Sequence, residues 1–215
     1  MLSSRGTVAA FRIEARALSK SYSGPPLFSE LSFQAPAGLT AIVGRNGSGK
    51  TTLLKILARL LPPGRGSVAV FEDARELSGE ERRLAVGWAG PDLAFYEDFT
   101  ARENLRFFRR AAGRPAPEAE LEERLKRVGL GFAADRRVGA FSTGMKQRLR
   151  LAFATLCDAP ILLLDEPAAG LDEEGRGILD VLVRERRARG PVLLASNEPR
   201  DFDAPDRTIP LGAPP

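Results

Sequence analysis

The sequence predicts an α/β protein with a three-layer core, an antiparallel β subdomain at the N-terminal end and an inserted helical subdomain. Two short runs, 161–164 and 191–195, are apolar and uncharged, which is typical of strands buried in a parallel sheet. A glycine-rich segment at 44–49 stands between a strand pattern and a helix pattern, and residues from 100 to about 157 have helical texture. Strands that alternate with helices in this way form layered α/β domains.

The N-terminal part is expected to be rich in strands. Five short segments either alternate between apolar and polar residues or run mostly without charge. They are residues 11–15, 31–35, 39–43, 67–71 and 85–88. Residues 51–61 carry leucines at helical spacing, and Pro62, Pro63 and Gly64 end this helix.

Helices dominate the region that follows. Thr100 and Glu103 have the spacing of a capping box, which predicts a helix from Thr100 through Phe108. Two further helices are expected at 117–128 and 143–157, and a charged, exposed helix at about 173–189. We therefore expect one domain over residues 1–215. Its nucleotide-binding core with the β subdomain would comprise residues 1–89 and 157–215, and its helical subdomain residues 90–156.

The composition excludes several classes of protein. The chain is 43% hydrophobic and 28% charged, and no apolar run approaches the roughly 18 residues of a membrane span. Residues 1–6 lack the apolar stretch of a secretion signal, so we expect a cytoplasmic protein. The absence of histidine excludes a histidine metal site and any histidine base. The single Cys157, next to Leu156, is expected to be buried and forms no internal disulfide.

The charge points to anionic partners in general and to no particular one. The formal net charge is +4, and the arginines are scattered among acidic residues. Such a distribution is typical of a solvated surface of mixed charge, so we expect no nucleic-acid partner.

The glycine-rich segment is a candidate phosphate-binding loop. It matches the pattern G-x-x-x-x-G-K-S/T between a strand and a helix. Glycines let successive backbone N–H groups face phosphates, and the dipole of the following helix favours negative charge. We expect Lys50 to reach the β- and γ-phosphates and the Thr51 hydroxyl to bind Mg²⁺. The expected binding segment is Gly44, Arg45, Asn46, Gly47, Ser48, Gly49, Lys50, Thr51 and Thr52.

Two acidic residues follow the apolar run 161–164. A phosphate loop requires a carboxylate on a neighbouring strand that holds Mg²⁺ through water, and ligands of α/β sheets lie at such strand ends. We expect Asp165 to serve the metal. Glu166 is expected to act as the general base that polarises the attacking water.

In this order the motifs resemble those of the ATP-binding subunits of ABC transporters, over residues 11–211. Residues 141–148 are similar to the family signature, in which Ser142, Thr143, Gly144 and Met145 precede a helix. Residues 168–172 resemble the family's D-loop, which ends in Asp172. Tyr22 has the place of the aromatic residue that stacks on adenine, and the alternative is an exposed tyrosine in a turn.

The resemblance implies a P-loop NTPase fold, ATP and Mg²⁺ as cofactors, and a head-to-tail dimer of ATPase subunits of like or unlike chains. In that dimer each phosphate loop faces the signature of the partner. It also implies membrane-spanning partner subunits, so the expected location is peripheral, on the inner, cytoplasmic face of the cell membrane. The coupling helices of these subunits dock between the glutamine loop and the helical subdomain. Five aromatic residues in this region form either a docking patch or the core of the helical subdomain. They are Phe95, Tyr96, Phe99, Phe107 and Phe108.

The chain departs from the family pattern at two positions. Pro91 stands where the family has a glutamine that reaches Mg²⁺ and the water, unless the alignment is shifted by one residue and Asp92 has that role. Asn197 stands where the family has a histidine that senses the γ-phosphate; it can donate a hydrogen bond but cannot become cationic. Because donors to developing charge are lost, we expect tight ATP binding and slow hydrolysis.

Several functions are compatible with this sequence. The segment 90–100 and the signature resemble those of haem exporter ATPases of cytochrome c maturation, although exporters of drugs, polysaccharide or lipid are similar there. A regulatory clamp that dimerises around ATP with little turnover is a second possibility, favoured by Pro91 and Asn197. An ABC ATPase of DNA repair or of the ribosome is a third, and it normally carries tandem cassettes or a long coiled coil.

Overall fold

The computed structural model describes residues 9–197 and 204–212 of the chain. Residues 1–6, on which the expectation of no secretion signal rests, lie outside this part. The strands are β1 (Phe11–Lys20), β2 (Phe28–Ala35), β3 (Gly38–Val43), β4 (Arg65–Glu72), β5 (Arg75–Glu76), β6 (Val86–Ala89), β7 (Ile161–Asp165), β8 (Pro191–Ala195) and β9 (Arg207–Pro210). The helices are α1 (Lys50–Leu57), α2 (Gly79–Leu84), α3 (Ala101–Ala111), α4 (Glu118–Arg127), α5 (Thr143–Ala154) and α6 (Glu173–Arg187), with 3₁₀ turns at Gly131–Ala133 and Val138–Ala140.

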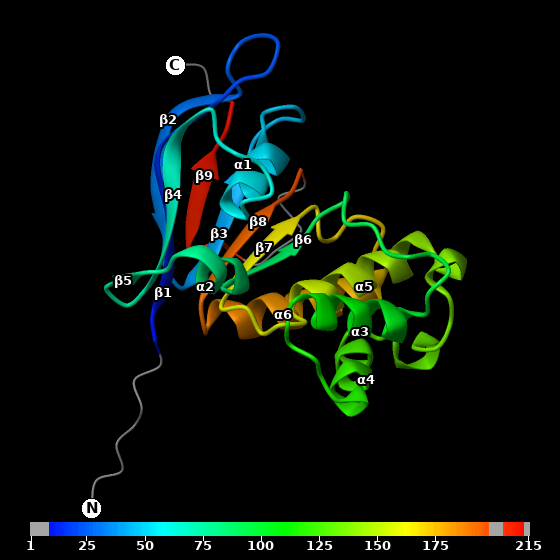
Figure 1. Ribbon diagram of the computed structural model, residues 1–215. Helices are drawn as coiled ribbons and strands as arrows, with labels where there is room; N and C mark the ends of the chain where they lie inside the picture. The colour runs from blue at the N-terminus through cyan, green and yellow to red at the C-terminus, as the bar shows by residue number, and fades with distance from the viewer. Residues whose placement is uncertain (1–8, 198–203, 213–215) are drawn as a thin grey trace, which may run out of the picture.

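Two sheets carry the β part of the molecule (Figure 1). The first is antiparallel, with strand order β2-β1-β4-β5, and pairs Ile13 of β1 with Ala35 of β2 and with Val70 of β4. The second is parallel, with strand order β6-β7-β8-β3-β9. The predicted antiparallel subdomain at the N-terminal end is therefore confirmed.

The central strands of the parallel sheet are buried on both faces. All five residues of β7 and all five of β8 are buried, which explains the two uncharged apolar runs. Side chains alternate between the faces, because Ile161 and Leu163 belong to one hydrophobic cluster while Leu162 and Leu164 belong to the other. Asp165, the last residue of β7, follows the same alternation.

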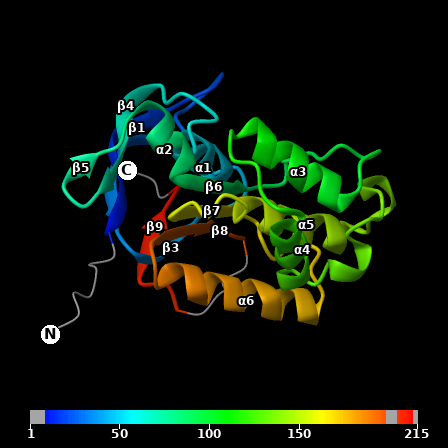
Figure 2. The same cartoon turned by 60° about the horizontal axis from the view of Figure 1, so that its bottom comes forward.

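The two clusters define the layers of the domain. One cluster joins the parallel sheet to α1 and to the antiparallel sheet, and the other joins it to α5, α6 and the helical part. Figure 2 shows α6 along one face of the parallel sheet, with the antiparallel sheet on the opposite side. The three-layer α/β architecture is as the sequence predicts.

The region between residues 90 and 156 is helical, and α3 to α5 pack on one another beside the sheet (Figure 1). The capping box at the start of α3 is present: the Thr100 hydroxyl accepts from the Glu103 amide, and the Glu103 carboxylate accepts from the Thr100 amide. Leu121 and Leu125 of α4 are fully buried against this part. The subdomain division at residues 90 and 156 remains our proposal, and these helices support it.

Two helices end earlier than their leucine patterns predict. The helix expected at 51–61 ends at Leu57, because Arg59 has a left-handed φ of 59° and the amides of Leu60 and Leu61 donate back to the Lys55 carbonyl. The helix expected at 143–157 ends at Ala154, where the Thr155 hydroxyl donates to the carbonyls of its own last turn. Cys157 therefore lies outside α5 and is half-buried, not buried as expected.

Three elements have no strong signal in the sequence. Helix α2 contains no buried residue, so it shows no apolar periodicity. Strand β5 has only two residues, both exposed. Strand β9 lies at the edge of the parallel sheet, and of its four residues only Ile209 is buried. Strand signals depend on buried side chains, and these segments have too few of them.

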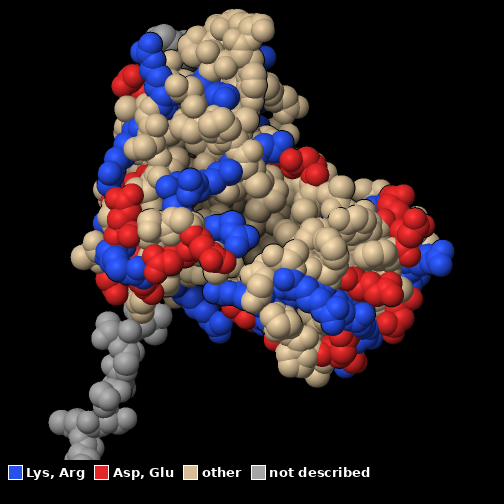
Figure 3. All heavy atoms as spheres, in the orientation of Figure 1, with Lys and Arg blue, Asp and Glu red and all other residues tan. Residues whose placement is uncertain are grey.

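On the face shown in Figure 3, positive and negative side chains are interspersed, and uncharged atoms fill the region between the β-rich part and the helical part.

Within the described ranges, we find no helix whose length and apolar character would let it cross a membrane.

Candidate functional site

The loop between β3 and α1 has the backbone that a phosphate loop requires. Gly47 and Gly49 have φ values of 81° and 97°, which other residues rarely adopt. Gly44 has no room for a side chain, because a Cβ there would lie 2.5 Å from the Leu211 carbonyl oxygen and 2.5 Å from the Ser48 hydroxyl. Gly49 is also the N-cap of α1, so the loop ends directly on a helix N-terminus. These glycines fix the course of the backbone around the loop.

Lys50 is the first residue of α1, and its side chain turns back into the loop. Its ammonium donates to the carbonyl of Gly44 at 2.8 Å, to that of Arg45 at 3.3 Å and to Oδ1 of Asn197 at 2.7 Å. Lys50 is only 6% exposed. All three acceptors are neutral oxygens, so the positive charge of the buried ammonium is not neutralised. Lys50 can therefore bind an anion such as a phosphate. Lys50 and Asn197, which are 147 residues apart, thus lie together as the sequence analysis expects.

Asp165 and Thr51 form a candidate metal site next to this loop. Asp165 is 1% exposed, and its Oδ2 atom has no hydrogen-bond partner. Burial raises the pKa of Asp165, the nearby Asp92 acts in the same direction, and a hydrogen bond with Thr51 opposes both. Asp92 itself pairs with Lys55 at 2.9 Å. A buried carboxylate oxygen without a partner, beside a hydroxyl, fits Mg²⁺ or a water bound to it.

The described residues contain no cluster of three or more acidic, histidine or cysteine ligands that could hold a metal by themselves. Asp92 lies close enough to Asp165 to contribute to the raised pKa of that carboxyl group, while its own carboxylate pairs with Lys55. The alternative that Asp92 takes the role of the family's glutamine stays a prediction.

Glu166 follows β7 in a strained conformation. Its φ is 48°, a left-handed value that is uncommon for residues other than glycine, and its amide donates to the Ala195 carbonyl at 2.8 Å. The backbone N–H of Asn197 donates to one carboxylate oxygen of Glu166 at 3.4 Å. Strain of this kind is typical of functional sites, where the surrounding structure holds a side chain in place. Lys50, Asn197, Asp165 and Glu166 therefore converge at the ends of β7 and β8.

The signature segment lies elsewhere on the chain. Ser142 caps α5, because its hydroxyl accepts from the Met145 amide at 3.2 Å. The segment opens on a hollow of about 510 Å³, which no residue of the phosphate loop lines. A Cβ on Gly144 would lie 2.9 Å from the Gly170 carbonyl oxygen, so the helix start and the D-loop are in close contact. The lining residues are Gly129, Leu130, Phe132, Ser142, Thr143, Gly144, Met145, Arg148, Gly170, Asp172 and Glu174.

Asp172 has a structural role that the sequence analysis does not anticipate. It caps α6 by accepting from the Gly175 amide at 2.9 Å, and it pairs with Arg148 at 2.5 Å. The hydrogen bond with Arg148 lowers the pKa of Asp172. Arg148, only 8% exposed at its side chain, also binds Glu174, so it ties the signature helix to the D-loop. A direct contact of Asp172 with nucleotide stays a prediction.

Tyr22 lies in the turn between β1 and β2 and is 62% exposed. The Lys20 ammonium stands 5.5 Å from the centre of its ring. The same turn ends at Leu27, which packs directly against Gly49 of the phosphate loop. The stacking role of Tyr22 stays a prediction.

The five aromatic residues divide between the two alternatives. Phe95 and Phe108 pack edge-on against Phe153 with centroid distances of 6.2 Å and 4.8 Å, as parts of a core. Tyr96, Phe99 and Phe107 are 49%, 39% and 41% exposed, and the Tyr96 ring contacts the rings of the other two. Phe95 and Phe108 thus belong to the core of the helical subdomain, while a docking role for the three exposed residues stays a prediction.

Arg150 and Gln147 of α5 were not predicted as site residues. Arg150 donates to the carbonyls of Pro91 and Leu93, and Gln147 donates to the carbonyl of Glu166. No spacing rule indicates these contacts, because they bridge 19 to 59 residues of sequence.

The comparisons with known proteins agree with this geometry. Residues 28–169 match the family model described as ABC transporter. The chain is 35% identical over 163 residues to the ABC transporter ATP-binding protein NatA of Bacillus subtilis, which covers 74% of this chain and 66% of NatA. It is 36% identical over 178 residues to the molybdenum import ATP-binding protein ModC of Brucella abortus, which covers 79% of this chain and 49% of ModC. The chain thus spans about half to two thirds of the length of these relatives.

Solved structures give the same result. A structure described as an ATP binding subunit of an ABC transporter is 30% identical, with a TM-score of 0.73 over 86% of this chain and 79% of that one. A dimeric ATP-binding cassette in a post-hydrolysis state with ADP and Pi has the same fold, with a TM-score of 0.78 over 93% of this chain and 94% of that one at 23% identity. With a phosphate loop, two strand-end acids and a signature helix on this fold, the chain belongs to the ABC transporter family.

Proposed function

We propose that this chain is an ATP-binding subunit of a transporter, which binds Mg·ATP in a head-to-tail dimer and hydrolyses it. The observation that carries the proposal is the convergence of Lys50 and Asn197 with Asp165 and Glu166 around one phosphate loop. The ADP and Pi named for the dimeric structural neighbour support the same reaction.

In this proposal each residue has a distinct task. Lys50 exchanges its carbonyl and amide partners for the β- and γ-phosphates, and the loop amides and the start of α1 bind the remaining oxygens. Thr51 and Asp165 hold Mg²⁺, which neutralises charge on the phosphates when bound. Glu166 accepts the proton of the attacking water as general base. Asn197 orients Lys50 in the nucleotide-free state and donates to the γ-phosphate afterwards.

The dimer supplies what one chain lacks. The signature hollow contains the N-terminus of a helix of twelve residues but no residue of its own phosphate loop. In a head-to-tail pair the Ser142–Met145 segment of one copy would face the γ-phosphate bound by the other, as the resemblance implies. Both halves of the site are thus present on every chain, and two chains complete two sites.

A purified sample of the full chain tests this function. We expect Mg·ATP to bind, to convert monomers into dimers in sedimentation velocity, and to be hydrolysed slowly. Each lost donor to the transition state lowers the rate by about 10²–10³. Pro91 has no side-chain donor, whereas Asn197 keeps a neutral donor and loses only the capacity to become cationic. Turnover near the enzyme median of about 10 s⁻¹ would contradict the slow step. Absence of ATP binding would refute the proposal, and dimerisation without any hydrolysis would favour the regulatory clamp.

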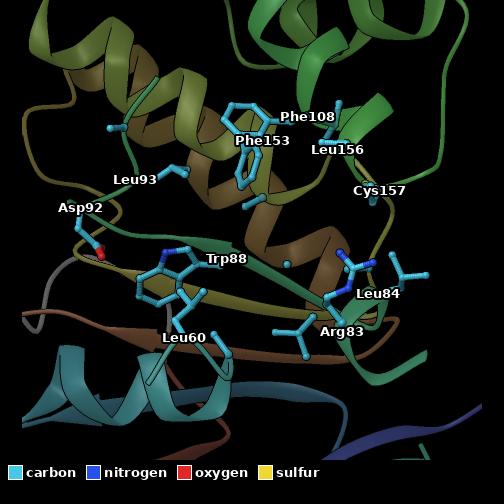
Figure 4. Close-up of a pocket in the computed structure, with 18 residues that line it drawn as sticks. Leu60, Arg83, Leu84, Trp88, Asp92, Leu93, Phe108, Phe153, Leu156 and Cys157 are labelled. Carbon is cyan, nitrogen blue, oxygen red and sulfur yellow. The ribbon is translucent and has the colours of Figure 1, made fainter. Parts of the chain in front are cut away.

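A groove on the surface supports the proposal of a membrane-spanning partner. A cavity of about 510 Å³ lies between the sheet and the helical part, and Figure 4 shows Trp88, Leu60, Leu93 and Phe153 directed into it. Leu60 is 58% exposed there. Exposed apolar side chains that line a groove are typical of protein contacts, and an amphipathic helix from a membrane subunit fits them. The groove adjoins the surface where the resemblance places a coupling helix, and of the five aromatic residues named there only Phe108 lines it.

A Leu60→Glu substitution tests the groove. Leu60 lies after the end of α1 and touches no residue of the proposed catalytic machinery, so basal ATP hydrolysis should stay unchanged. Binding to the reconstituted membrane subunit should fall by about tenfold or more, because a charge would be buried at the contact. Val181→Glu is the matched control, since Val181 is 52% exposed on α6, away from the groove. Equal binding of both variants would contradict the docking site.

The names of the relatives do not support haem as the cargo. NatA is an ABC transporter ATP-binding protein, ModC serves molybdenum import, and another relative of 36% identity is a Nod factor export protein of Burkholderia orbicola. These names span import and export of unrelated molecules. Haem export therefore rests only on the sequence resemblance of the segment 90–100 and of the signature, and we propose a transport ATPase without assigning its cargo.

A further inference from the structure

Arg150 joins the groove to the candidate catalytic site. It lies on α5 and is half-buried. Each of its three guanidinium nitrogens donates a hydrogen bond to a different acceptor. Nε donates to the Leu93 carbonyl at 3.2 Å, Nη2 to the Pro91 carbonyl at 3.1 Å and Nη1 to Oε1 of Gln147 at 2.9 Å. The rigid planar fork of arginine suits such a set of acceptors, which a single ammonium cannot reproduce. One side chain thus fixes the segment 91–93 to α5.

Gln147 continues the chain of contacts to the proposed general base. It is 4% exposed, and its Nε2 donates to the carbonyl of Glu166 at 3.2 Å and to that of Pro167 at 2.9 Å. The amide orientation follows from chemistry, because its oxygen must face the Arg150 donor and its nitrogen the two carbonyls. Arg150 thus binds the backbone of the segment 91–93, and Gln147, its partner, binds the backbone at 166–167.

These contacts bear on two unusual features of the site. Pro91 cannot donate from its side chain or its backbone nitrogen, so the segment 91–93 is held through its carbonyl groups instead. Glu166 has a left-handed φ of 48°, a conformation that persists only where neighbours over-determine it. The Gln147 amide is one of the groups that hold this backbone.

We propose that Arg150 is a positioning residue that couples the groove to Glu166 through Gln147. The groove end of this connection comprises Asp92 and Leu93, which line the cavity, and Trp88, whose ring lies against Gly90. A partner helix that shifts the segment 91–93 would move the Arg150 guanidinium, and through Gln147 the backbone of Glu166. The inference rests on the proposed ATPase function and adds the route by which the groove acts on it.

The chain contains a suitable probe for this coupling. Trp88 is its only tryptophan, and a Cβ on Gly90 would lie 2.2 Å from the indole ring, so the start of the segment contacts the fluorophore. Arg150→Met keeps the length of the side chain and removes all three donors. Arg109→Met is the matched control, because Arg109 is also half-buried and donates to a backbone carbonyl, that of Leu156, but does not contact the segment 91–93.

The experiment uses the full chain and three measurements: ATP affinity by calorimetry, steady-state hydrolysis, and Trp88 emission with and without Mg·ATP. In the wild type we expect Mg·ATP to change the Trp88 emission. In Arg150→Met we expect this change to be lost and kcat to fall by about twofold to thirtyfold. ATP affinity and KM should stay within about twofold of the wild-type values, because Arg150 touches no group that binds nucleotide. Arg150→Lys should restore the emission change only in part, and Arg109→Met should behave as the wild type.

Other results overturn the inference. An Arg150→Met variant that keeps both the emission change and kcat would show that Arg150 only stabilises the fold. A wild-type chain that binds ATP without any change of Trp88 emission would show that the groove is not coupled. An equal loss in Arg109→Met would indicate general loosening of the helical part. A wild-type chain that does not bind ATP would instead refute the proposed function itself.

Discussion

A Glu166→Gln variant is expected to bind Mg·ATP as tightly as the wild-type chain while its hydrolysis rate falls by about 10²–10⁴-fold. The glutamine side chain has the same shape but cannot take a proton from the attacking water. The left-handed backbone of residue 166 imposes a similar strain on glutamate and glutamine, so the fold should be retained. Because ATP stays intact in the variant, the dimer that encloses it should persist.

The measurement compares single-turnover hydrolysis with sedimentation in Mg·ATP. Glu173→Gln serves as control, because Glu173 is an exposed acid in the first turn of α6. We expect the control to hydrolyse ATP at the wild-type rate and to dissociate after turnover. Wild-type hydrolysis in Glu166→Gln would remove Glu166 from the reaction and leave Asp92 or Asp165 to be tested as the base.

An Asp165→Asn variant is expected to stabilise the nucleotide-free protein and to weaken its response to Mg²⁺. Asp165 is 1% exposed, its Oδ2 atom has no hydrogen-bond partner, and burial raises the pKa of its carboxyl group. A neutral amide removes the charge from this buried position, and an unsatisfied buried charge costs more than the roughly 1–3 kcal/mol of an unsatisfied neutral polar group. The difference between these two costs is the expected gain in the free energy of unfolding. For a chain of this size each kcal/mol raises Tm by about 2–4 °C.

The Asp165→Asn variant should also bind Mg²⁺ more weakly than the wild-type chain. An amide carries no charge to attract Mg²⁺ or to orient its water, and changes of such partners lower metal affinity by about 10–100-fold. Thermal unfolding with and without Mg·ATP measures both effects. We expect a higher Tm than wild type in the absence of ligand and a smaller rise on adding Mg·ATP. Asp98→Asn, at an exposed position, is the control and should change neither value. A lower Tm without ligand would show that Asp165 stabilises the fold.

The sequence was sufficient where the signal is local. The phosphate loop can be recognised because its glycines, Lys50 and Thr51 are consecutive, and the backbone angles of Gly47 and Gly49 are those the motif requires. Asp165 and Glu166 follow an uncharged apolar run, and parallel strands bring such ends to one edge of the sheet. The capping box of α3 is equally local, and it is present as expected.

The rest depends on contacts between distant segments. The pair between Lys55 and Asp92 and the bonds from Arg150 to the segment 91–93 arise only when α1 and α5 pack beside the sheet. Nothing in the order of residues indicates which of many arginines reaches a given carbonyl. The left-handed backbone of Glu166 is likewise imposed by its neighbours, since glutamate itself disfavours that conformation.

The alternation of side chains along β7 limits how this strand can change. Ile161 and Leu163 of β7 face the layer that contains α1. Asp165, two residues further on, faces the same side and forms a hydrogen bond with Thr51 of α1. Inserting or deleting a single residue within the strand would reverse the facing of every position after it and turn the Asp165 side chain toward the opposite layer. The leucines of β7 can therefore be replaced by other apolar residues of similar size. The length of the strand cannot change, because Asp165 must face Thr51.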